Sequence, residues 1–198
     1  MHVSTLYPSS SIRALMLEEL QHDVRRQQVW HSRRLTPRGR AIWSHLLAEA
    51  IHEGDPITLA RALSRDGRMV AIEGRLTRRG PRTVWVPRNA AEVLAWGEFN
   101  RFAIRAMCRR AVELGQPFVV VYRARRSKNP RPESEALVGM RMCPTDLLGV
   151  VRQAPDGTTM SFPPGPNSGL SVRLALGHEL PAGMEGSGVR WTEPPRAA

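Results

Sequence analysis

The sequence has almost no lysine, few cysteines and no long apolar run. Lys128 is the only lysine among 29 basic residues, and it does not stand in a Gly-x-x-x-x-Gly-Lys motif, so a P-loop NTPase is excluded. Cys108 and Cys143 are too few for a disulfide scaffold, and we expect buried or idle thiols in a reducing compartment. No segment approaches the roughly 18 apolar residues of a membrane-spanning helix, and no signal peptide is recognisable.

Motifs that carry chemistry are also missing. The chain contains no Gly-x-Ser-x-Gly, Gly-x-Gly-x-x-Gly or Cys-x-x-Cys pattern. These absences argue against a serine hydrolase of the nucleophile-elbow type, a dinucleotide-binding enzyme and a dithiol redox or zinc site. We therefore expect a protein without enzymatic activity and without a cofactor.

The sequence is rich in arginine, and its net charge is +11. One explanation for the arginine content is a GC-rich genome, which encodes basic surface positions as arginine whatever the function. The alternative is a functional one, because the guanidinium group suits the recognition of phosphate and carboxylate groups. Residues 55–88 hold eight arginines against three acids, and residues 116–153 hold seven basic residues against three. This concentration in two segments favours a functional surface over a uniform bias.

Hydrophobic periodicity predicts an α/β (α+β) fold. Its parts are a helical N-terminal region, a basic β-hairpin, a long central helix and a small mixed sheet. We expect helices over residues 11–30, 37–53, 57–63, 90–114 and 144–152, and strands over 69–77, 83–86, 118–122, 136–142 and 170–176. The expected organisation is an N-terminal helical segment (1–35), a single α/β domain (36–176) and a flexible C-terminal tail (177–198).

Several helix boundaries have local signals. Thr36-Pro37 and Asp55-Pro56 each offer an N-cap followed by proline at the first helical position. Gly54 is expected to end the helix between them, and Asn89 to cap the longest helix. That helix is apolar around more of its surface than contact with one neighbour requires, so it is expected to be central.

Residues 37–87 have the order of a winged helix-turn-helix, namely two helices joined by a tight turn and then a hairpin. This interpretation places Arg61 and Arg65 in the major groove of DNA and Arg78, Arg79 and Arg82 on phosphates. The alternative is a pair of packed helices and an ordinary hairpin, with arginines that serve solubility.

Arg101, Arg105 and Arg109 recur every four residues along the long helix, with Glu98 and Glu113 within pairing distance. Such a row is a further candidate for nucleic-acid binding, since guanidinium groups grip phosphate. The alternative is a solvated helix edge with weak salt bridges. Because the rest of this helix is so apolar, we expect the arginine row to face either solvent or acidic groups.

Two metal-dependent hypotheses are weaker. His45, Glu49 and His52 share one helix face and are residue types that bind zinc or iron. The pattern is neither His-Glu-x-x-His nor a Glu-x-x-His pair repeated on another helix, and no cysteine or further histidine cluster supplies more ligands, so we assign no metal site. A metal-dependent nuclease would need converging carboxylates. The candidates, around the strand expected at 118–122, are Glu98, Glu133, Glu135 and Asp146.

Five segments carry a resemblance to a known protein family. They are residues 98–102, 105–111 and 121–124, Pro-Arg-Pro-Glu-Ser-Glu (130–135) and Gly-Pro-Asn-Ser-Gly-Leu (165–170). Through them the chain resembles a protein family encoded in phages and prophages of GC-rich bacteria, over about residues 36–175. The resemblance implies a mobile-element protein from the virion-assembly genes. It implies no activity, ligand or catalytic residue.

The leading hypothesis is a non-enzymatic phage or prophage structural or assembly protein. It would act through protein-protein contacts with other virion or assembly proteins and through contacts with double-stranded DNA, as a monomer or oligomer. It would work away from membranes, in the cytoplasm of the bacterial host or in the phage particle. The alternative is a DNA-binding protein of winged-helix type, and the third hypothesis is the metal-dependent nuclease.

Overall fold

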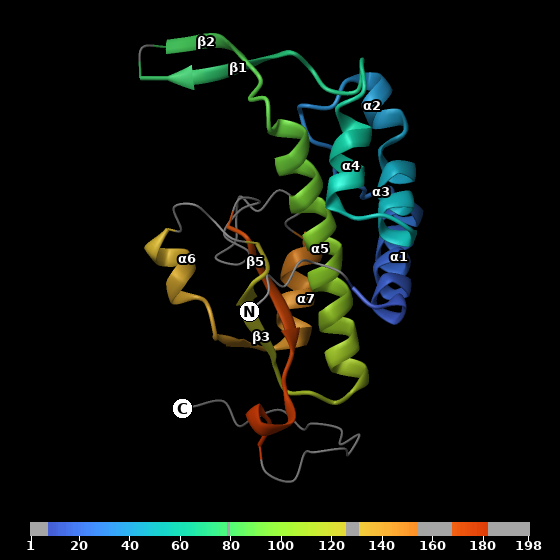
Figure 1. The fold of residues 1–198 in the computed structure, drawn as a ribbon, viewed down its shortest axis with the longest axis vertical. Coiled ribbons are helices and arrows are strands. Elements are labelled where there is room, and N and C mark those ends of the chain that lie inside the picture. Colours follow the sequence, from blue (N-terminus) through green and yellow to red (C-terminus); the bar gives the residue numbers. More distant parts are fainter. Residues whose placement is uncertain (1–7, 79, 126–130, 154–167, 182–198) are drawn as a thin grey trace.

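The computed structural model describes residues 8–78, 80–125, 131–153 and 168–181. Within these ranges a long helix, α5 (Ala90–Glu113), runs through the middle of the molecule with helices on one side and a small sheet on another (Figure 1). The expected α+β class is confirmed. No helix in the described ranges combines the length and apolarity needed to cross a bilayer.

Four helices precede the first strand: α1 (Ser10–Arg25), α2 (Pro37–Ala41), α3 (Trp43–His52) and α4 (Pro56–Leu63). The caps expected at Thr36 and Asp55 form. Thr36 Oγ1 accepts from the amide of Gly39 at 3.0 Å, and Asp55 Oδ1 accepts from the amide of Thr58 at 2.7 Å. Proline at the first position of α2 and of α4 fixes φ without losing a helical hydrogen bond.

Two helices differ from the prediction. The first ends at Arg25 rather than near residue 30, because Gln27 adopts a left-handed φ of 57° that turns the chain back. The single helix predicted over 37–53 is two helices, since Ile42 departs from helical geometry with φ −109°. In both places no glycine or proline marks the break, so the sequence gives no signal for it.

The main hydrophobic core lies between α5 and the helices α1, α3 and α4. Met16, Trp43, Phe99 and Phe102 are among its largest fully buried side chains. The indole of Trp43 donates to the carbonyl of Trp30 at 3.0 Å, which satisfies its buried N–H. Since α1 belongs to this core, it shares its packing with the helices of the expected domain 36–176.

A second core lies on another side of α5, against α7 (Pro144–Gln153) and an antiparallel sheet in the order β4-β3-β5. These strands are β3 (Val119–Arg123), β4 (Arg141–Met142) and β5 (Leu170–Leu174). Cys108 is buried in this core, and burial raises the pKa of its thiol to about 12, whereas Cys143 is exposed. Cys108 therefore stays protonated at neutral pH.

The sheet corrects two expectations. Its pairings are antiparallel, not mixed. The strand expected over 136–142 is wrong, because Pro132 starts a short helix, α6 (Pro132–Ala136), and only two residues of that range pair with β3. Gly139, with φ 87°, forms the turn between helix and strand. The tail expected over 177–198 starts with a 3-10 helix, η1 (Gly177–Glu179), and residues 182–198 lie outside the described ranges.

The hairpin between α4 and α5 projects from the body as a two-stranded arm (Figure 1). Its strands are β1 (Ile72–Thr77) and β2 (Gly80–Trp85), paired antiparallel so that Thr77 faces Gly80 across the turn. The connection is shorter than the gap between the expected strands, 69–77 and 83–86, because the pairing continues to Thr77 and Gly80. At the base of the arm Arg34 binds the carboxylate of Glu73 through two hydrogen bonds of 2.6 and 2.7 Å, which tie the ribbon to the helical body.

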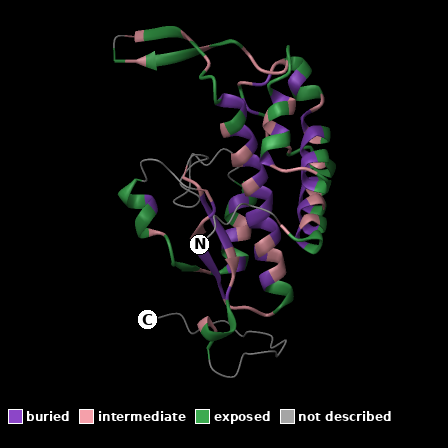
Figure 2. Cartoon of the chain, viewed as in Figure 1, coloured by how far each residue is buried: buried purple, intermediate pink, exposed green. Residues whose placement is uncertain are grey.

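A buried ionic network joins α1 to α5. The guanidinium of Arg105 is 0% exposed and donates to Glu19 at 2.7 Å and to both carboxylate oxygens of Asp23 at 2.6 and 2.8 Å. Arg101 lies 3.8 Å from Asp23 and binds Glu98 at 2.9 Å, and Arg152 on α7 binds Glu19 from another side. Three helices therefore meet on a cluster of charges whose carboxylates, Glu19 and Asp23, are buried. Figure 2 shows that much of α1 and α5 is buried.

The titration of the network follows from these contacts. Burial alone would raise the pKa of Glu19 and of Asp23, but hydrogen bonds from Arg152 and Arg105 outweigh it, and both pKa values are lowered. At Glu98 burial prevails, so its pKa is raised even though Arg101 lies beside it. Glu19 and Asp23 are therefore held as carboxylates by their arginine partners.

We predict that Arg105→Met lowers the free energy of unfolding by about 3–5 kcal/mol, since it leaves buried carboxylates without their main partner. The matched control is Arg110→Met on the same helix, whose pair with Glu113 is about half exposed and contributes less than about 1 kcal/mol. Urea unfolding of both variants measures the difference. Equal losses would contradict a structural role for the network.

We further predict that acid weakens the fold through Glu19 and Asp23. Because their folded-state pKa values are lowered, their contribution is complete above the unfolded values of about 4 and is lost as the pH falls toward the folded ones. Glu98, with its raised pKa, acts in the opposite sense. Urea unfolding from pH 7 to 3 should show a steeper decline for the wild type than for the variant E19Q/D23N; a wild-type stability that is flat with pH would refute this.

Candidate nucleic-acid interface

The arginines of the described chain differ in their partners. Several in the body have carboxylate partners, as Arg105 with Asp23 and Arg173 with Glu179 at 2.7 Å. A second group is exposed, and no carboxylate in the described ranges lies within 4.0 Å of these side chains: Arg61, Arg65, Arg75, Arg78, Arg82 and Arg88. These six lie on α4, just after it, on the arm and on the segment that joins the arm to α5, and we call this region the basic end of the molecule. Other exposed arginines without such a partner in the described ranges lie elsewhere: Arg25, Arg26, Arg33, Arg38, Arg40, Arg131 and Arg141.

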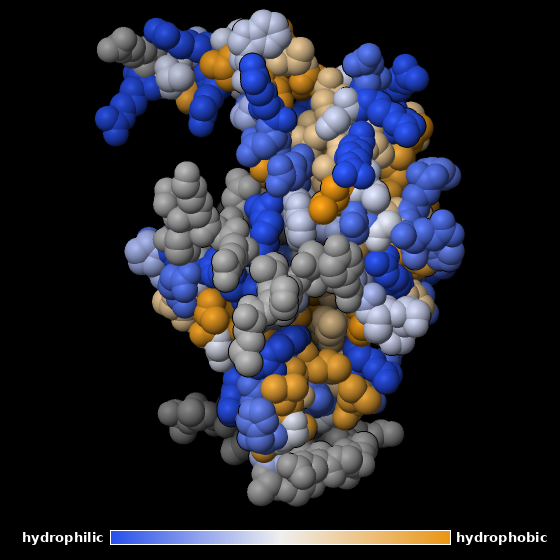
Figure 3. All heavy atoms as spheres, in the orientation of Figure 1, coloured by the Kyte–Doolittle hydropathy of each residue, from blue (hydrophilic) through white to orange (hydrophobic). Residues whose placement is uncertain are grey.

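The arm carries two of these arginines directly opposite each other. The strand register pairs Arg75 with Arg82 on the same face of the ribbon. Like charges in opposed positions destabilise a strand pair. Glu73 lies on this face too, but both its oxygens are engaged by Arg34. The basic face of the arm, defined by Arg75 and Arg82, is thus suited to an anion supplied from outside the chain, and hydrophilic side chains project from this arm in Figure 3.

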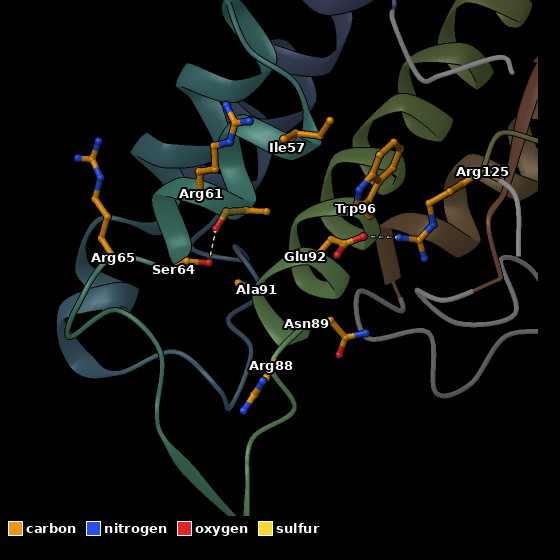
Figure 4. Close-up of a pocket in the computed structure, with 11 residues that line it drawn as sticks. Ile57, Arg61, Ser64, Arg65, Arg88, Asn89, Ala91, Glu92, Trp96 and Arg125 are labelled. Atoms are coloured by element: carbon orange, nitrogen blue, oxygen red, sulfur yellow. Dashed lines mark hydrogen bonds and ion pairs between the residues drawn. The ribbon is translucent and has the colours of Figure 1, made fainter. Parts of the chain in front are cut away.

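A shallow groove of about 570 Å³ lies at the base of the arm, between α4 and the start of α5. Arg61 and Arg65 border it on the α4 side, and Arg88 lies below them (Figure 4). On the opposite side Arg125 lies 3.8 Å from Glu92 and stacks over Trp96, with 5.4 Å between guanidinium and ring centroid. Since one carboxylate faces four arginines, the groove has a positive potential.

The N-terminus of α5 opens into the same groove. Asn89 occupies the expected N-cap position, but its side chain makes no capping hydrogen bond and lines the groove (Figure 4). The first amides of a helix carry partial positive charge, which adds to the field of Arg88 next to them. The helix end and the arginines therefore favour the same kind of ligand, an anion.

The residues predicted to bind nucleic acid have different positions in the structure. Arg61, Arg65, Arg78 and Arg82 are exposed at the basic end of the molecule, as the prediction requires, and the side chain of Arg79 lies outside the described residues. Arg61 lies on α4 and Arg65 just after it, while Arg78 and Arg82 lie on the arm.

The arginine row on α5 requires a correction. Arg101 and Arg105 are buried, and Arg109 pairs with Glu18 at 2.7 Å. The row faces acidic residues of α1 instead of solvent or nucleic acid. The sequence did not reveal this because Glu19 lies 86 positions before Arg105, and only the packing of α1 against α5 brings them together.

The elements of the winged-helix hypothesis occur in the expected order, but the ribbon points away from the helical body (Figure 1). Leu59 and Leu63 of α4 are buried against the core, while Ile57 and Arg61 are exposed. One face of α4 is therefore accessible to a ligand, and the ribbon extends the accessible surface beyond the helices.

The metal-dependent hypotheses gain no support from the described residues. His45 faces Glu49 at 3.6 Å, whereas His52 faces Glu53 at 3.1 Å, and none of the acidic, histidine or cysteine residues in the described ranges form a group of three that suits a metal ion. Of the four carboxylates proposed for a nuclease, Glu98 is buried against Arg101 and Glu135 pairs with Arg123 at 2.6 Å; Glu133 and Asp146 are exposed on α6 and α7.

Sequence reasoning missed four residues of this interface: Arg75, Arg88, Trp96 and Arg125. A signal existed for Arg75, since a two-residue turn at 78–79 places it opposite Arg82. For Trp96 and Arg125 no signal existed, because a loop after β3 and the second turn of α5 meet only through the tertiary fold.

Comparisons with family models, with curated proteins and with solved structures found no match to this chain.

Proposed function

We propose that this protein acts by binding, and that its basic end contacts the phosphate backbone of double-stranded DNA. The observation that carries the proposal is that six exposed arginines without a carboxylate within 4.0 Å in the described ranges lie together on one continuous part of the chain, from α4 through the arm to the start of α5. Guanidinium groups on such a surface bind phosphates and release the counterions of the duplex, which drives association.

The distribution of the charge favours a long polyanion over a small one. A strand of six residues spans about 20 Å, which matches about six base pairs of duplex. Arg75, Arg78 and Arg82 lie in the outer half of this length. The groove between α4 and α5 adds further arginines at the base of the arm. A small anion would engage one part of this surface, whereas a duplex engages the arm and α4 together.

The proposal predicts a steep salt dependence. In electrophoretic mobility shifts with duplex DNA over a salt series, log K should fall with log salt with a slope of several units, and Arg75→Ala/Arg82→Ala should reduce the slope by about 2, since each phosphate contact contributes about 0.9. The matched control is Arg25→Ala/Arg131→Ala, which removes two exposed charges from outside the arm and α4. An identical slope for both double variants, or no binding at low salt, would refute the proposal.

The role in a phage particle is a separate proposal and rests on the sequence resemblance alone. A DNA-binding subunit with an extended arm is compatible with an assembly protein that contacts both packaged DNA and other virion proteins. It predicts that mass spectrometry of purified particles from a host that carries the gene detects the protein. Its absence from particles would remove this proposal and leave DNA binding untouched.

A further inference from the structure

The arm has a second face, opposite to its basic face, and this face is apolar. The register pairs Ile72 with Trp85 and Leu76 with Pro81. Ile72, Leu76 and Trp85 are 53%, 84% and 79% exposed, which makes Leu76 and Trp85 the most exposed of the large hydrophobic side chains in the described ranges. We call these four residues the apolar face of the arm. In Figure 3 hydrophobic side chains lie among the hydrophilic ones at this end of the molecule.

This face is not explained by the fold. A two-stranded ribbon on its own is marginally stable in water, and apolar side chains on it gain nothing from facing solvent. None of these side chains belongs to a hydrophobic core of the body. The arm is tied to the body through Arg34 and Glu73 at its base. The apolar face therefore fits a ligand that covers it when the arm is engaged.

We propose that the ligand is the DNA duplex itself, and that Leu76 with Pro81 inserts as a wedge between two stacked base pairs from the minor groove and kinks the duplex. This inference rests on the proposed function. Leu76 and Pro81 form the strand pair next to the closing pair at the tip, so they are the first apolar side chains that an approaching groove meets. Leucine and proline are among the side chains that unstack base steps in this way.

Charge complementarity selects DNA as the occupant. Arg75 precedes Leu76 and Arg82 follows Pro81, so each wedge residue has an arginine next to it on the opposite face of the ribbon. Arg78 lies at the tip, beyond the last strand pair. With this arrangement the guanidinium groups reach the phosphates along the groove while the apolar pair faces its floor.

The chemistry of the face also selects the mode of contact. Leu76 and Pro81 offer no side-chain donor or acceptor to a base edge, so they do not read sequence by hydrogen bonds. The minor groove of B-DNA is about 6 Å wide, and the two strands lie about 4.8 Å apart, so entry of the arm requires a widened groove. A kink toward the major groove, which an inserted wedge produces, supplies that widening.

A second copy of the chain fits the face less well. A stable protein interface buries about 800 Å² on each partner, and a face of four side chains on a narrow ribbon falls short of that area. The arginines behind the face would also bring two basic arms together, which costs free energy.

The test uses the full-length protein and a short DNA duplex with donor and acceptor dyes at its ends. The duplex carries 2-aminopurine beside a central TA step, since pyrimidine–purine steps are easily unstacked. Wild-type protein should raise energy transfer, because the ends approach, and should raise 2-aminopurine fluorescence, because the base unstacks. Leu76→Ser should abolish both changes and leave the slope of log K against log salt within about 0.5 unit of the wild type, since no phosphate contact is removed. Leu76→Met, which keeps an apolar side chain of similar length, should restore both signals.

Val112→Ser is the matched control, since Val112 is half exposed on α5, far along the helix from the arm. It should bend DNA as the wild type does, and the melting temperatures of all variants should agree, because Leu76 contributes nothing to the core. If the wild-type protein binds the duplex but changes neither energy transfer nor 2-aminopurine fluorescence, the wedge proposal is overturned and the proposal of DNA binding stands. If the wild-type protein does not bind the duplex, both proposals are overturned. Bending that is unchanged in Leu76→Ser, together with a loss of self-association in sedimentation, would assign the apolar face to a protein contact and overturn the proposal.

Discussion

The contact on which the structure depends is the buried pairing of Arg105 with Glu19 and Asp23. Charges removed from water are tolerated only when they are closely matched. Here two carboxylates of α1 receive five hydrogen bonds from the side chains of Arg105 and Arg152, with further pairing from Arg101 and Arg109. This match fixes the position of α1 along α5. It also has a consequence for the surface, because acids engaged in the interior do not neutralise arginines elsewhere. The exposed arginines of the arm and α4 are among those left without a carboxylate within 4.0 Å in the described ranges.

Local rules predicted the parts of the fold that local interactions determine. Thr36 and Asp55 cap their helices and α5 extends over almost the expected residues, because caps, proline positions and apolar periodicity act within a few residues. The break at Ile42 and the left-handed Gln27 were not predictable, since no residue type there demands them. The length of β4 was overestimated in the prediction, because residues 136–142 divide among the end of a helix, a turn and a strand of two residues.

The candidate site divides in the same way. The arginines of the arm were predictable from charge density and turn chemistry, whereas those of α5 were misassigned because regular spacing shows that residues share a helix face without showing what lies against it. A stripe of arginines on a helix and a stripe on a ribbon look alike in the sequence. The two kinds of stripe differ in the distance from guanidinium to carboxylate. For Arg105 that distance depends on α1, whose Asp23 lies more than 80 residues earlier in the sequence.

The same residue type thus performs two roles, and the protein keeps them apart in space. Around α5 arginine neutralises acids and holds helices together, so its replacement acts on folding. On the arm arginine has no carboxylate to satisfy in the described ranges, and the opposed pair Arg75 and Arg82 makes the isolated ribbon less stable than one with neutral residues would be. A repulsive pair next to an exposed apolar face is costly in the free protein and favourable only when an anion and a stacked apolar surface arrive together. Duplex DNA provides both, which is why charge and hydrophobicity on opposite faces of one narrow ribbon are consistent with a single ligand.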